Sequence, residues 1–309
     1  MKNSLLFLFI LCFAFKKSGA QEFIPLWPKD KKPNFNGKIV PDSIANERAW
    51  KVGTPGMYAF RVPQAENKGV SILICPGGGF ERVSYIYNGF QFAKWFNSIG
   101  INVYVLLYRL PHQKDLQQKE IASWQDAQRA MRIIRGNAAN WDLKPDKIGV
   151  MGISAGGYVA STLGTHTEDV SAIKDSLDAV SFKPDFMLLL SPVITMKEYA
   201  HPGSKKNLLG ADTTKERTDL YSNELHVTAQ TPPAFIVHAA NDNTVPVQNS
   251  LLFYSALMDK KVNASIHVFP QGAHGIKLRD NPGSTELWIA LCEAWMNEMN
   301  ITSPMGVKK

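Results

Sequence analysis

Short apolar runs alternate along most of the chain with segments whose apolar residues recur at helical spacing. The apolar runs are nearly continuous, which is typical of strands buried on both faces of a sheet. They occupy 57–62, 70–75, 101–108, 147–152, 186–190, 234–238 and 264–269. The helical segments occupy 90–98, 123–140, 155–164, 247–260 and 284–298. This alternation predicts an α/β fold with a mostly parallel central sheet that carries helices on both faces.

Two stretches follow neither pattern. Residues 21–55 are rich in Pro, Lys and Asn, and we interpret them as an extended arm that wraps the domain. Residues 195–230 are polar and irregular, and we interpret them as a small cap over the functional site. The sequence contains no internal repeat or low-complexity linker, so we expect a single domain over 21–309.

The first residues have the pattern of an export signal. A basic start at 1–3 is followed by an apolar run at 5–15, and Ser18 and Ala20 are small residues at the spacing that a signal peptidase recognises. The pattern predicts a signal peptide over 1–20 and a periplasmic or extracellular protein. About eleven apolar residues are too few to span roughly 30 Å of hydrocarbon. Because no second run of 18 apolar residues exists, we expect no membrane span.

Composition and charge exclude several classes of protein. The chain has 309 residues, of which 45% are hydrophobic and 20% charged, and this excludes a disordered or disulfide-packed chain. Loss of Lys2, Lys16 and Lys17 with the signal lowers the net charge of +7 by three, to +4. The remaining Lys and Arg are scattered, so we expect no nucleic-acid partner. We interpret Cys75 and Cys292 as small core residues, with a disulfide between them as the alternative in an exported protein.

A candidate nucleophile stands in the sequence Gly-Ile-Ser-Ala-Gly at 152–156. The motif follows a predicted strand and opens a predicted helix, and a serine on such a sharp turn projects its hydroxyl above the sheet. The flanking glycines allow the tight turn and the approach of a substrate. The alternative interpretation is a glycine-rich turn that only caps the helix. We predict that Ser154 is the nucleophile.

A serine hydroxyl needs a base and a carboxylate. His274 lies in the glycine-flanked sequence Gln-Gly-Ala-His-Gly directly after the last predicted strand, and Asp242 follows the strand that contains His238. Carboxyl ends of parallel strands are where open α/β sheets place ligands. The order Ser154, Asp242, His274 is that of a nucleophile-elbow hydrolase. Asp242 as an ordinary turn residue is the alternative, and we interpret His238 as a core histidine or strand-end contact. The histidines that we take as surface or structural residues are His112, His166, His201, His226 and His267.

The sequence Pro-Gly-Gly-Gly-Phe at 76–80 follows another predicted strand. Glycines there allow backbone amides to approach a substrate oxygen. The spacings of a phosphate-binding loop and of a dinucleotide-binding turn are both absent. No His-x-x-x-His spacing occurs either, which argues against a metal-dependent deacetylase. We therefore expect neither a cofactor nor a metal.

Together these motifs resemble the α/β-hydrolases, and in particular secreted bacterial esterases related to acetyl-xylan and feruloyl esterases. The residues that carry the resemblance are Cys-Pro-Gly-Gly-Gly-Phe at 75–80, Tyr-Arg-Leu at 108–110, Gly-Ile-Ser-Ala-Gly-Gly at 152–157, Asp242 with Val245 and Pro246, and Gly-Ala-His-Gly at 272–275. The resemblance implies that the amides of Gly78, Gly79 and Ala155 hold the oxyanion. The chain departs from the pattern at Pro76, where hormone-sensitive-lipase-like esterases have His, and at Asn88, where Glu is expected.

These observations favour an exported serine esterase that hydrolyses acetyl or feruloyl esters of plant polysaccharide fragments such as xylan, with an oligosaccharide or small-molecule ester as its partner. Phe80 and Tyr158 stand near the site loops, and we interpret them as substrate contacts because aromatic rings stack on sugars. A place in the core is the alternative for both. Two other functions remain open: a prolyl-oligopeptidase-like serine peptidase, and a carbohydrate-binding relative that has lost its activity.

Overall fold

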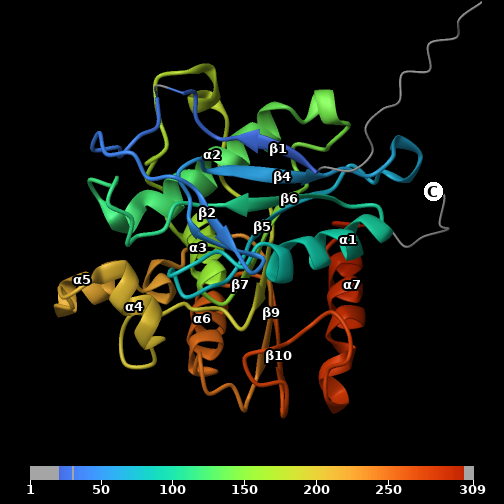
Figure 1. Ribbon diagram of the computed structural model, residues 1–309. Coiled ribbons are helices and arrows are strands. Elements are labelled where there is room, and N and C mark those ends of the chain that lie inside the picture. The colour runs from blue at the N-terminus through green and yellow to red at the C-terminus, as the bar shows by residue number, and fades with distance from the viewer. Residues whose placement is uncertain (1–20, 30, 303–309) are drawn as a thin grey trace, which may run out of the picture.

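The computed structural model describes residues 21–29 and 31–302, so the predicted signal peptide lies outside the described residues. A central sheet of eight strands is sandwiched between two layers of helices, as Figure 1 shows. The predicted α/β class, with its mostly parallel sheet, is confirmed. Among the described residues, no helix has the length and apolar character needed to cross a membrane.

The strand order places the most buried strands in the middle of the sheet. In spatial order the strands are β1 (Glu22–Pro25), β4 (Gly56–Phe60), β6 (Asn102–Leu107), β5 (Ser71–Cys75), β7 (Ile148–Ile153), β8 (Met187–Leu190), β9 (Ala234–Ala239) and β10 (Ala264–Phe269). β1 and β4 run antiparallel at one edge, and the strands from β6 to β10 are parallel. Every residue of β5, β6, β7, β8 and β9 is buried, which explains their unbroken apolar sequences.

The helices cover both faces of the sheet. α1 (Gln91–Ser98) and α7 (Trp288–Glu298) pack together on one face, where Trp95 and Trp288 meet edge to face with ring centroids 5.8 Å apart. α2 (Ala122–Gly136), α3 (Ala155–Thr165) and α6 (Gln248–Asp259) lie on the other face (Figure 1). Both remaining cysteines are free and buried, so they are core residues and not a disulfide.

The arm has more regular structure than its sequence suggests. Besides β1 it contains a hairpin of β2 (Ser43–Ala45) and β3 (Arg48–Lys51). Its buried anchor is Trp27, whose indole N–H donates to Asp126 on α2 at 2.8 Å. Asp126 also forms a fully buried ion pair with Arg109, and the Arg109 guanidinium lies 5.9 Å from the centre of the Trp27 ring. The arm therefore closes over an ion pair that connects β6 to α2.

The stretch 195–230 also contains helices that its polar sequence does not reveal. They are α4 (Pro202–Leu209) and α5 (Lys215–Leu220). Asn207 on α4 donates from its side-chain amide to the carbonyl oxygen of Gly79 at 2.8 Å. This segment is thus attached to the glycine loop that follows β5.

A histidine pair beneath α3 makes the fold sensitive to acid. The rings of His166 and His226 lie 4.4 Å apart, and Trp124 contacts the ring of His166 edge to face. Burial, and then the charge of His226, lowers the pKa of His166 from 6.5 to about 4. The unfolded chain binds a proton here below about pH 6.5, whereas the folded chain does so only near pH 4. Protons therefore favour the unfolded state throughout this range.

We expect the free energy of unfolding to fall by an amount on the order of 3 kcal/mol between pH 7 and pH 4 through this side chain. Urea unfolding at several pH values measures how the free energy of unfolding changes with pH. The control is His166→Asn, which removes this titrating ring and should make the curve between pH 6.5 and 4 shallower, while His201 and His267, whose pKa values burial also lowers, keep their own contributions. Aspartates with lowered pKa, such as Asp169 and Asp175, lose their contribution only below their usual value near pH 4. An equal slope in the Asn variant would contradict the assignment.

Candidate active site

Three side chains far apart in the sequence meet at the carboxyl edge of the parallel strands. Ser154 follows β7, Asp242 follows β9 and His274 follows β10. The Nε2 atom of His274 lies 2.8 Å from the Ser154 hydroxyl, and its Nδ1 atom lies 2.7 Å from the Asp242 carboxylate. The structure thus brings the three predicted residues together, with His274 in contact with both Ser154 and Asp242. A hydroxyl, an imidazole and a carboxylate in this line can transfer a proton from the serine to the histidine.

Ser154 stands on a sharp and strained turn between β7 and α3. Its φ of 56° lies in the left-handed region, with ψ at −124°, and the backbone of L residues rarely adopts this conformation. The glycines on either side leave no room for a side chain: a Cβ on Gly156 would lie 1.9 Å from the carbonyl oxygen of Cys75. The strand and helix are therefore held close together, and the serine side chain is pushed to the surface of the cavity.

Both oxygens of the Asp242 carboxylate accept hydrogen bonds. Oδ1 accepts from the backbone amides of Thr244 and Val245, each at 2.9 Å. Oδ2 accepts from His274 and lies 3.2 Å from Nε2 of His238. Burial alone would raise the pKa of Asp242, but the hydrogen bonds from His238 and His274 outweigh it and hold the pKa well below its usual range. Asp242 therefore stays ionised and fixes the orientation of His274.

His238 is a buried strand-end contact, one of the two roles that its sequence position suggested. Its Nε2 atom lies 3.0 Å from the carbonyl oxygen of Val245, besides its contact with Asp242. Since both neighbours only accept, Nε2 carries the proton. Nδ1 lies 2.7 Å from the hydroxyl of Ser250, which can donate to it. His238 therefore supports Asp242 at the same carboxylate oxygen that His274 contacts, a role that the sequence did not reveal.

The glycine loop after β5 has the shape of an oxyanion site. Gly78 and Gly79 adopt φ values of 140° and 65°, which favour glycine. The Tyr108 hydroxyl donates to the carbonyl oxygen of Pro76 at 2.7 Å, and Asn207 holds that of Gly79. Among the backbone hydrogen bonds of the described loops, none uses the amide of Gly78 or Gly79 as donor. Ala155 is the first residue of α3, where a backbone amide has no partner within the helix.

Ser154 opens into a cavity of about 440 Å³. It is lined by Gly78, Gly79, Glu81, Arg82, Ser84, Tyr87, Asn88, Ile153, Ser154, His201, Gly203, Asn207, Thr244 and His274. The glycine loop, the triad and the start of α4 therefore share one space. Among the described residues, no group of three or more His, Cys, Asp or Glu side chains is arranged to hold a metal ion.

The structure does not bring Phe80 and Tyr158 to this cavity, so they do not fit the predicted role of substrate contacts. Phe80 is fully buried, and its ring packs edge to face against Tyr108 and Tyr158 with centroids 6.4 and 5.8 Å away. Tyr158 is also buried and lines a separate cavity behind α3. An apolar side chain beside a glycine loop gains more by filling the core than by facing water. The aromatic residue that does line the cavity is Tyr87, which is 42% exposed.

Sequence reasoning also missed His201, which it assigned to the surface or a structural role. His201 lines the cavity together with His274. The criterion of flanking glycines excluded it, because His201 is held by a helix start instead of a glycine loop. A signal was present: Pro202 directly follows, and Pro at the first position of a helix marks its N-terminus.

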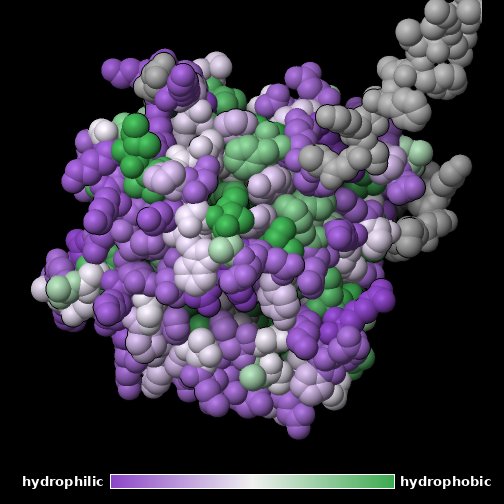
Figure 2. Space-filling model, viewed as in Figure 1, coloured by the Kyte–Doolittle hydropathy of each residue, from purple (hydrophilic) through white to green (hydrophobic). Residues whose placement is uncertain are grey.

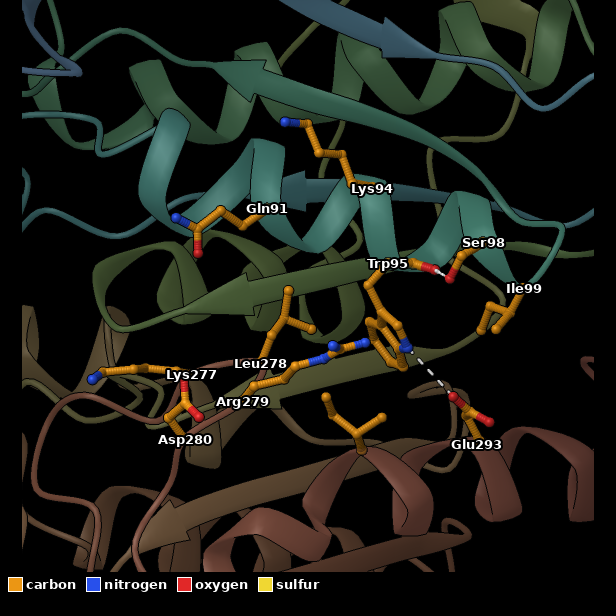
Figure 3. A pocket seen from close by; sticks show the side chains of 11 residues that line it. Gln91, Lys94, Trp95, Ser98, Ile99, Lys277, Leu278, Arg279, Asp280 and Glu293 are labelled. Atoms are coloured by element: carbon orange, nitrogen blue, oxygen red, sulfur yellow. Dashed lines mark hydrogen bonds between the residues drawn. The ribbon is translucent and has the colours of Figure 1, made fainter.

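A larger hollow of about 750 Å³ lies elsewhere, between α1 and α7. Figure 3 shows Trp95 on its wall, with its indole N–H bonded to Glu293, and the basic side chains of Lys94, Lys277 and Arg279 around it. Figure 2 shows one face of the molecule as a mixture of polar and apolar residues. No member of the triad lines this hollow, so size alone does not locate the active site.

The sheet, the elbow and the bonded Ser–His–Asp group together define an α/β-hydrolase. The chain matches the BD-FAE family over residues 60–257, and it belongs to this family.

Relatives and solved structures agree with this assignment. The chain is 34% identical over 229 residues, 74% of its length, to endo-1,4-beta-xylanase B of Butyrivibrio fibrisolvens. It is also 34% identical over 212 residues, 67% of its length, to an acetylxylan esterase of Xylanibacter ruminicola. It spans only 35% and 41% of the lengths of these two proteins.

Among solved structures, the chain is similar to an acetyl ester-xyloside bifunctional hydrolase of Caldicellulosiruptor lactoaceticus, with a TM-score of 0.78 and 33% sequence identity. The match covers 92% of this chain and 98% of that protein. A thermophilic esterase of Thermogutta terrifontis shares the fold with a TM-score of 0.68 at 21% identity, covering 90% and 96% of the two chains.

Proposed function

We propose that the chain is a serine esterase that removes acyl groups, acetyl or feruloyl, from xylan fragments. The observation that carries this proposal is the line of hydrogen bonds from Ser154 through His274 to Asp242, in the same cavity as a glycine loop whose Gly78 and Gly79 amides donate to no described backbone carbonyl. The substrate class is supported by relatives named acetylxylan esterase and acetyl ester-xyloside hydrolase. The names of both relatives specify acetyl as the acyl group, and feruloyl is the alternative acyl group.

The geometry supports an acyl-enzyme mechanism. His274 takes the proton of Ser154 at Nε2 as the serine oxygen attacks the ester carbonyl carbon. The amides of Gly78, Gly79 and Ala155 stabilise the oxyanion of the tetrahedral intermediate. His274 then gives its proton to the leaving alcohol oxygen as the carbon–oxygen bond breaks. A water molecule that loses a proton to His274 attacks the acyl carbon, and His274 returns this proton to the Ser154 oxygen as the bond between that oxygen and the acyl carbon breaks, which releases the acid and restores the serine.

The ionised Asp242 stabilises the positive charge that His274 carries between these proton transfers. Its own proton is not involved, since its pKa is held well below its usual range. His238 and the amides of Thr244 and Val245 fix the carboxylate, so it needs no reorganisation during the reaction. The chain's residues thus supply every proton transfer that ester hydrolysis requires.

We further propose that the protein is exported, with residues 1–20 removed as a signal peptide. The basic start, the apolar run at 5–15 and the small residues Ser18 and Ala20 support this proposal. Expression of the full chain in a bacterium, followed by mass measurement of the periplasmic product, tests it. The proposal expects a chain that begins at Gln21, and an uncleaved cytoplasmic product would contradict it.

The substrate is tested by a release assay on acetylated and feruloylated xylo-oligosaccharides, with products identified by mass. We expect acetate release from acetylated oligosaccharides in the wild-type protein, because the triad and the oxyanion loop are both assembled. Cleavage of a dipeptide amide in preference to these esters would favour a peptidase. Failure of a fluorophosphonate to label Ser154 would indicate a binding protein without activity.

A further inference from the structure

His201 stands at the first turn of α4 and faces the same cavity as the triad. It is the residue before the helix, and the cavity that it lines also contains Ser154 and His274. Its ring overhangs the glycine loop: Cε1 lies 3.7 Å from the point that a Cβ on Gly79 would occupy. The side chain is therefore within the space that a bound ester must enter.

The cap fixes which nitrogen of His201 carries the proton. Nδ1 accepts the backbone N–H of Ser204 at 3.1 Å and lies 2.8 Å from the Ser204 hydroxyl. A backbone N–H only donates, so Nδ1 has no proton and the neutral ring carries its proton on Nε2. Ser204 is fully buried, which holds the ring in this orientation. Burial, and then the charge of His274, lowers the pKa of His201, so the ring stays neutral.

The Nε2–H group of His201 forms no hydrogen bond with another described residue. Two other donors that line the cavity already have partners, and the side chains of Arg82, Ser84, Tyr87, Asn88 and Thr244 line it as well. The amide of Asn207 holds the carbonyl oxygen of Gly79, and Nε2 of His274 serves the Ser154 hydroxyl and then the leaving oxygen. The backbone amides of the glycine loop and of Ala155 serve the ester carbonyl oxygen. An acetyl group offers only that oxygen and a methyl group, so a further neutral donor matches the hydroxyls of the alcohol.

We propose that His201 determines specificity for the alcohol side of the ester: its Nε2–H donates to the hydroxyl oxygen of the sugar carbon next to the acylated one. The inference rests on the proposed esterase function and adds the chemistry by which the site recognises a sugar. An acylated sugar with a free neighbouring hydroxyl is then preferred over an ester that lacks one. His201 neither forms nor breaks a bond in this role.

The test uses His201→Asn, since Asn is a good helix cap that keeps an acceptor for the Ser204 amide but does not extend as far. The probes are a monoacetylated methyl xyloside, its analogue without the neighbouring hydroxyl, and 4-nitrophenyl acetate. We expect the kcat/KM ratio of the xyloside to its deoxy analogue to fall about tenfold in the variant, as loss of one hydrogen bond implies. The ratio of the deoxy analogue to 4-nitrophenyl acetate should stay constant.

The matched control is Asn207→Ala, which loosens the glycine loop through Gly79 and should lower kcat for all three esters together. An equal fall for all three esters in His201→Asn would overturn the proposal, because it would place His201 with the loop. An unchanged xyloside ratio would overturn it as well. If the wild-type protein hydrolyses 4-nitrophenyl acetate but neither xyloside, the proposed substrate class fails and the inference fails with it. If the wild-type protein prefers the acetylated xyloside but the variant does too, only the inference fails.

Discussion

Ser154→Ala is expected to lower kcat for 4-nitrophenyl acetate by about 10⁶-fold, since no other group can form the acyl-enzyme. The alanine removes only the hydroxyl that lies 2.8 Å from His274. The backbone turn remains, because its strained φ is imposed by the packing of β7 against α3 and not by the side chain. Steady-state kinetics at high enzyme concentration measures the loss, and thermal unfolding should show a folded protein.

The matched control is Ser84→Ala, because Ser84 lines the same cavity but its hydroxyl bonds to no histidine among the described residues. A fluorophosphonate should label the Ser84→Ala protein as it labels the wild type, and it should leave Ser154→Ala unmodified. Retention of more than about a hundredth of the turnover by Ser154→Ala would end the assignment of the triad, since oxyanion stabilisation alone does not sustain that rate.

Asp242→Asn is expected to lower kcat by about 10⁴-fold while leaving the nucleophile in place. The Asn carbonyl would remain with the amides of Thr244 and Val245, so its NH₂ group would face His274. That NH₂ donates to Nδ1 and leaves the His274 proton on Nε2, where the ring cannot accept a proton from Ser154. Activity is therefore lost because His274 holds the wrong tautomer, and not because the distance between His274 and Ser154 changes.

The same variant carries a second, structural penalty that is particular to this chain. The new NH₂ group also faces the N–H of His238, which now has a donor where it had a carboxylate acceptor. Two opposed donors in a buried place cost about 1–3 kcal/mol of the free energy of unfolding. Urea unfolding measures this cost, with Asp280→Asn as control, because Asp280 is exposed in the loop after His274. A variant with normal kcat would contradict the role of Asp242.

The strands and the triad could be predicted because local sequence determines both. Strands buried on both faces must be apolar throughout, and the structure has strands at all seven predicted places. Each residue of the triad comes after one of these strands: Ser154 directly, and Asp242 and His274 in the loops that follow. The parallel sheet therefore brings all three to one edge. The arm and the segment 195–230 were harder, because their strands and helices are stabilised by contacts with distant residues such as Asp126 and Gly79.

The walls of the cavity were the least predictable part. Phe80 adjoins the glycine loop in sequence, yet its φ of 58° turns the side chain into the core. His201 is more than forty residues from Ser154 in the chain, and only the packing of α4 against the glycine loop brings it into the cavity. The motifs thus predicted the three side chains that meet at the edge of the sheet but not the residues around them, because side-chain direction depends on tertiary packing.

The attachment of the arm imposes an order on folding. Trp27 and Asp126 are separated by 99 positions, so their hydrogen bond cannot form before α2 has been synthesised. Until the arm closes over it, the pair of Arg109 and Asp126 remains open to water, where opposite charges attract each other only weakly. The arm is synthesised early but can be fixed only after α2 is present, and a chain without Trp27 would leave this ion pair open to water.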